Sequence, residues 1–139
     1  MELITDRTKS DVLLGTEKGH YSAADLNRVE RAVAELIRIA KRLDVCGDIR
    51  VKTDWGEPDA FSAQQWPTKG QLFRYLDNIH RLCHAVELAV NLPSSMERLT
   101  WEGANQIEQA LLLTYERIQN ILQAFRFSGE FYAGEEKGI

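Results

Sequence analysis

The sequence has little cysteine. Its 139 residues include two cysteines, Cys46 and Cys83, and neither lies in a CxxC pair. This spacing excludes a zinc ribbon and a thioredoxin-like redox motif. Two isolated thiols in a chain of this size are typical of a reducing compartment, although the spacing leaves a disulfide between them open.

Long apolar runs are absent as well. Near the N-terminus, Asp6, Arg7, Lys9 and Asp11 interrupt the apolar residues, which excludes a secretion signal and a transmembrane helix. We therefore expect a protein made in the cytoplasm, with no membrane partner. The formal net charge of -4 gives no excess of basic residues to neutralise phosphates, so nucleic acid is not an expected partner.

Motifs that carry chemistry are scarce. Neither GxGxxG nor GxxxxGK[ST] occurs, so no phosphate-binding loop and no cofactor are predicted. Glu30 and Glu35 are predicted on a solvated helix face, where acid–base catalysis has no desolvated cleft. A local basic bias is interpreted as an exposed helix face, or else as a surface for an acidic protein. Its members are Arg28, Arg31, Arg38, Lys41, Arg42 and Arg50.

One cluster has the spacing of a metal site. His80 and His84 stand four residues apart and would share a helix face, with Cys83 beside them. The cluster lacks the HExxH glutamate, and the sequence offers no evident fourth ligand. We therefore expect Cys83 to be a core residue flanked by two boundary histidines, and we expect neither a metal nor catalytic residues.

Three long helices are predicted from capping signals followed by apolar stripes. Ser22 with Asp25 and Thr68 with Gln71 fit the capping-box pattern, and Thr100 provides a third N-cap. Apolar residues then recur every three or four positions, as on one face of a helix. Gly47, Pro93 and the glycines after residue 127 mark the expected ends.

The expected fold is mainly all-α: a three-helix bundle over residues 20–127, an N-terminal arm over 1–19 and a tail over 128–139. The arm either packs on the body through Leu3, Ile4, Val12 and Leu14, which is the more usual outcome, or reaches a neighbouring subunit. The alternating residues 49–53 predict a strand, paired with Phe131 and Tyr132 as a short two-stranded β element. Trp55, Phe61 and Trp66 lie in the aromatic-rich loop between, where they would either anchor the loop or form a contact surface.

Several short strings, in this order, resemble a group of small proteins and domains encoded by phages and prophages of Gram-positive bacteria, near tail, baseplate or tail-fibre genes. The strings are ITDRT at 4–8, DV at 11–12, Tyr21, DLNRVE at 25–30, KTDW at 52–55, LT at 99–100, AN at 104–105, IE at 107–108, FSGE at 127–130 and Tyr132. The resemblance covers nearly the whole chain and transfers no catalytic residue. It implies a tail-associated structural role in the virion.

Three functions are therefore weighed. The first is a helical adaptor of a phage tail or prophage-derived particle, which binds other virion proteins and copies of itself through the arm, through the loop with Trp55 and Trp66, and through the tail with Phe131 and Tyr132. The second is a small cytosolic regulator of one host or phage protein. The third is a metal-dependent enzyme using His80 and His84.

Overall fold

In the residues that the structure describes, the fold is helical and comprises five helical elements. The computed structural model describes residues 2–41, 49–56 and 66–132, with side chains as far as residue 124. The elements are α1 (Lys9–Leu14), the 3-10 helix η1 (Glu17–Gly19), α2 (Ala23–Ala40), α3 (Lys69–Ala85) and α4 (Trp101–Tyr132). None of the helices in the described ranges is both long and apolar enough to span a membrane.

The three long helices begin at the predicted caps. The Asp25 carboxylate accepts the backbone N–H of Ser22 at 2.6 Å, and Thr68 and Gln71 exchange two such bonds at 2.9 and 3.1 Å. The Thr100 hydroxyl accepts the N–H of Gly103 at 3.0 Å. Each bond satisfies a donor that the first helical turn leaves without a partner, which fixes where the helix starts.

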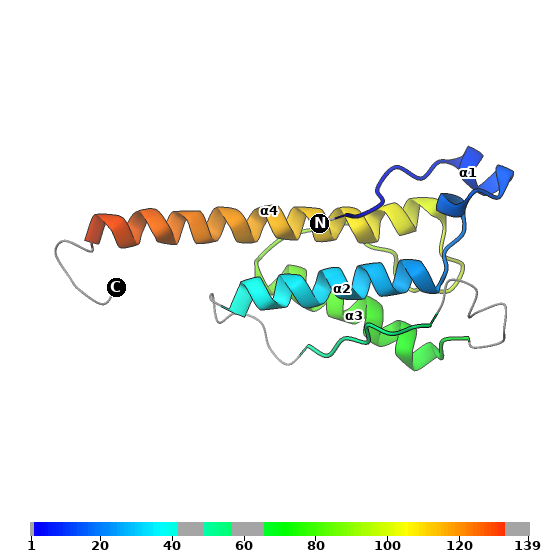
Figure 1. The fold of residues 1–139 in the computed structure, drawn as a ribbon, viewed down its shortest axis with the longest axis horizontal. Helices are drawn as coiled ribbons and strands as arrows, with labels where there is room; N and C mark the ends of the chain where they lie inside the picture. The colour runs from blue at the N-terminus through cyan, green and yellow to red at the C-terminus, as the bar shows by residue number, and fades with distance from the viewer. Residues whose placement is uncertain (1, 42–48, 57–65, 133–139) are drawn as a thin grey trace.

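The helices α2, α3 and α4 run in the same direction, and each packs against the other two (Figure 1). Long connections return the chain to the same end of the bundle after α2 and after α3. Side chains from all three helices fill the core between them. Its largest fully buried members include Leu26, Val29, Val33, Leu36, Tyr75, Ile79, Leu82, Ile107, Leu111 and Ile118.

The helix α4 is the longest, with 32 residues against 18 in α2. At 1.5 Å per residue these lengths correspond to about 48 and about 27 Å. The C-terminal part of α4 therefore extends beyond the ends of α2 and α3 (Figure 1). The helix α3 ends earlier than Pro93, because Glu87 adopts a left-handed φ of 55°. The amides of Glu87 and Leu88 then bond back to the carbonyls of His84 and Cys83, which closes the helix.

The predicted two-stranded β element is wrong. No strand occurs in the described part of the chain, and Phe131 and Tyr132 belong to α4. Residues 49–53 have no strand partner because side chains of the neighbouring helices satisfy their backbone instead. Glu30 accepts the N–H of Lys52 at 3.1 Å, and Asn78 donates to the carbonyl of Arg50 at 2.6 Å.

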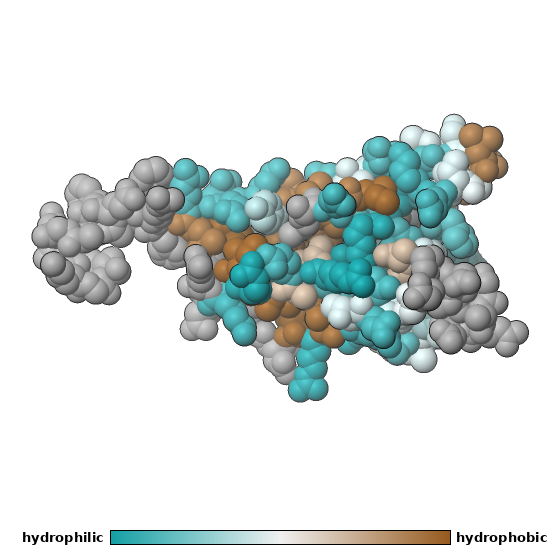
Figure 2. Space-filling view, viewed as in Figure 1, coloured by the Kyte–Doolittle hydropathy of each residue, from teal (hydrophilic) through white to brown (hydrophobic). Residues whose placement is uncertain are grey.

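The arm packs on the body only in part. Leu3 and Ile4 are half-buried, as predicted, but Val12 and Leu14 are exposed. Packing of Val12 and Leu14 on the body is therefore a wrong prediction. The apolar tip of α1 instead stands at a corner of the molecule (Figures 1 and 2).

Candidate functional site

The histidines and the cysteine of the cluster with metal-site spacing do not converge, since Cys83 faces the core and the two histidines face outward. Cys83 is buried and lies 3.3 Å from the hydroxyl of Thr114 on α4. His80 and His84 are exposed. The described ranges hold no group of three or more His, Cys, Asp or Glu side chains that could bind a metal ion.

The thiol of Cys83 is also a poor nucleophile. Burial raises its pKa above the ordinary value, and the hydrogen bond with Thr114 offsets only part of that rise. A raised pKa lowers the fraction of thiolate, the reactive form. The predicted core role of Cys83 agrees with its burial and its contact with α4.

The aromatic residues predicted as partner contacts have different environments. Trp55 is buried, and its indole N–H donates to Glu30 at 2.6 Å, so this ring anchors the segment to the core. Trp66 is 68% exposed. Phe61 lies outside the described residues, and the side chains of Phe131 and Tyr132 do too.

A buried guanidinium attaches the arm to the bundle. Arg7 is 3% exposed, and its Nη2 lies 2.5 Å from Glu108 on α4 and 3.3 Å from Asp25 on α2. The other donors of Arg7 bond to the carbonyls of Ile4 and Lys18. Asn105 accepts the backbone N–H of Arg7 at 3.1 Å and donates to its carbonyl at 2.9 Å. We call Arg7, Asp25, Asn105 and Glu108 the arm latch.

The arm latch is balanced in charge by a second arginine. Arg28 donates to both oxygens of Glu108 at 2.8 Å and to Asp25 at 2.6 Å. Two guanidinium groups thus face two carboxylates. Buried charges are tolerated in proteins when they are paired and hydrogen-bonded in this way. These four groups tie the arm, α2 and α4 together through paired charges.

A second buried network joins α2, α3 and the segment 49–56. Glu30, predicted on a solvated face, is 1% exposed. Its carboxylate accepts hydrogen bonds from both terminal nitrogens of Arg74, at 2.8 and 2.9 Å, and from the indole N–H of Trp55. Asn27 pairs with the backbone of Trp55 and Gly56. In the described residues, every buried polar side-chain atom has a partner.

Apolar side chains, by contrast, are exposed at the end of α1. Val12, Leu13 and Leu14 are 45%, 75% and 78% exposed, and we call them the α1 tip. Both ends of the short helix that carries the tip are capped, because Thr8 and Asp11 form a capping box at its start and Gly15 ends it with a φ of 67°. A side chain at Gly19 would come within 2.3 Å of the Asp11 carbonyl, so η1 packs backbone to backbone against α1.

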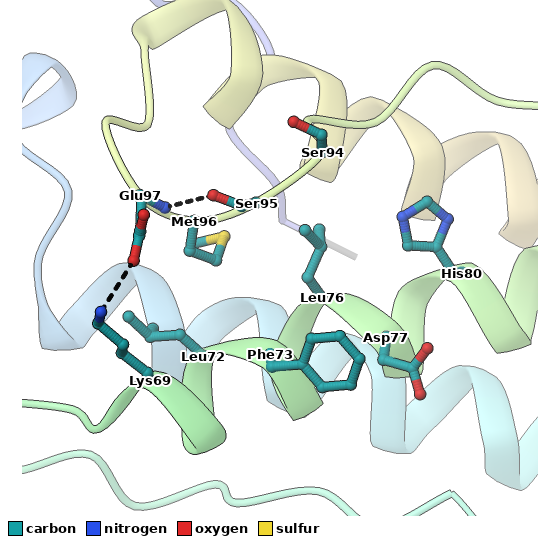
Figure 3. A pocket seen from close by; sticks show the side chains of 10 residues that line it. All are labelled: Lys69, Leu72, Phe73, Leu76, Asp77, His80, Ser94, Ser95, Met96 and Glu97. Carbon is teal, nitrogen blue, oxygen red and sulfur yellow. Dashed lines mark hydrogen bonds and ion pairs between the residues drawn. The ribbon is translucent and has the colours of Figure 1, made fainter.

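The second exposed apolar feature is a groove beside the first half of α3. Its volume is about 440 Å³. Leu72, Phe73 and Leu76 of α3 form one wall, and the segment 94–97 with Met96 forms the other (Figure 3). Phe73 is 72% exposed. We call this hollow the α3 groove. The Lys69–Glu97 ion pair closes one end of the groove, and Asp77 and His80 lie at the other end.

Sequence reasoning missed the α1 tip and the α3 groove, although the sequence carries a signal for each. The predicted packing of Leu14 rests on its apolar character alone, and Phe73 is not among the predicted contact residues. The helical register places Phe73 beside Asp77, four residues on, at the polar edge of the stripe. An aromatic residue at the polar edge of an apolar stripe is expected to be exposed.

Comparison with known proteins gives no match: no family model, no curated protein and no solved structure is similar to this chain. The two exposed apolar features, together with the fully paired buried polar groups, are therefore the basis for a functional proposal.

Proposed function

We propose that the chain is a structural protein of a phage or prophage-derived particle, a helical adaptor of the tail, baseplate or tail fibre that works by binding other proteins. The α1 tip is the observation that carries this proposal. Burying a leucine side chain contributes about 1.5–3 kcal/mol, and Leu13 and Leu14 forgo most of that contribution in the isolated chain. A partner surface would recover it.

The way the tip is held supports a binding role over an accidental exposure. The arm latch holds Arg7 between α2 and α4, and capping bonds close both ends of α1, while Leu13 and Leu14 stay 75% and 78% exposed. Ordering the tip before binding reduces the conformational entropy that binding must overcome. A rigid apolar tip is what an assembly protein requires.

The resemblance to tail-associated proteins agrees with where its strings lie in the fold. Arg7 belongs to the string at 4–8, and Asp25 and Arg28 belong to the string at 25–30. Asn105 and Glu108 belong to the strings at 104–105 and 107–108, in the first turns of α4. The strings thus supply the residues that fix the arm on the bundle. Their role is to hold α1 in place, which fits a structural adaptor better than an enzyme.

The test is the protein content of purified particles. Phage or induced prophage particles from a strain that encodes this chain would be purified on a density gradient and analysed by mass spectrometry. An adaptor is expected in the particle fraction at a fixed ratio to known tail proteins. Recovery of the chain only from the particle-free lysate would refute the proposal and favour a regulator.

A further inference from the structure

We draw no further inference here: the strongest candidate, the apolar α3 groove between the first half of α3 and the segment 94–97, carries none, because its carboxylates Asp77 and Glu97 are already ion-paired with Arg81 and Lys69 of the same chain and nothing in the structure shows what covers it.

Discussion

Replacing Glu108 with glutamine tests the proposed role of the arm latch. Glu108 is fully buried on α4 and accepts hydrogen bonds from Arg7, from Arg28 and from the backbone N–H of Ile4 at 3.0 Å. Glutamine has nearly the same shape but no charge. Its NH₂ group would face hydrogen-bond donors, with which it cannot form hydrogen bonds. The variant would leave the buried guanidinium of Arg7 and the half-buried one of Arg28 with the single carboxylate of Asp25.

The size of the effect follows from the burial of the partners. Removing one member of a buried ion pair costs about 3–5 kcal/mol. The Arg7 side chain is 2% exposed and bears this cost fully, whereas that of Arg28 is 24% exposed and is partly screened by water. We therefore expect a loss near the lower end of that range, about 3 kcal/mol in the free energy of unfolding. With an m-value of about 2 kcal/mol per M, the urea midpoint would fall by roughly 1.5 M.

Urea unfolding followed by circular dichroism measures this loss. The matched control is Glu102→Gln, which removes the same charge at an exposed position of α4. Exposed substitutions of this kind stay within about 0.5 kcal/mol of the wild type. If Glu108→Gln lies within the same margin as its control, the charges of the arm latch contribute nothing to the fold and the reasoning fails.

Three further predictions concern the arm, the second network and the buried hydroxyls. Arg7→Ala should release the arm, so a lysine-specific protease should cut at Lys9 and Lys18 faster than in the wild type, with cleavage at Lys69, the first residue of α3, unchanged. Trp55→Phe should cost about 1.5–3 kcal/mol through loss of its bond to the charged Glu30. Glu30→Ala removes the acceptor of the same bond, so costs that simply add in the double variant would refute the pairing. Burial raises the pKa of both Tyr21 and Tyr75, whose hydroxyls bond to one another, above the ordinary value near 10. Because these pKa values are higher in the folded state, the contribution of the two neutral hydroxyls to the free energy of unfolding is fully present below about pH 10 and is lost above it. The urea midpoint should therefore fall above that pH, and it should fall less in Tyr75→Phe.

The helices could be predicted from the sequence because their signals are local. A capping residue and an apolar stripe act within a few turns, so Ser22, Thr68 and Thr100 mark the starts of α2, α3 and α4 correctly. The parallel arrangement of the three helices has no such local signal. It depends on contacts such as those between Arg28 and Glu108, which are 80 residues apart in the sequence.

The buried charges and the missing strand could not be predicted for the same reason. Glu30 flanks the apolar stripe of α2 and is indistinguishable in sequence from a solvated glutamate until Arg74 and Trp55 are placed around it. The alternation in residues 49–53 does not produce a strand, because the backbone there bonds to the side chains of Glu30 and Asn78. A pattern that predicts an extended segment does not predict what satisfies its hydrogen bonds.

The central claim is that the chain works by presenting the α1 tip to protein partners in a particle. The most direct measurement is the amount of Leu13→Asp protein in particles from a strain that lacks the wild-type gene, compared with wild-type protein expressed to the same level. The account predicts that the folded variant stays in the particle-free lysate while the wild type sediments with particles. Equal incorporation of both proteins, or absence of the wild type from particles, would contradict it.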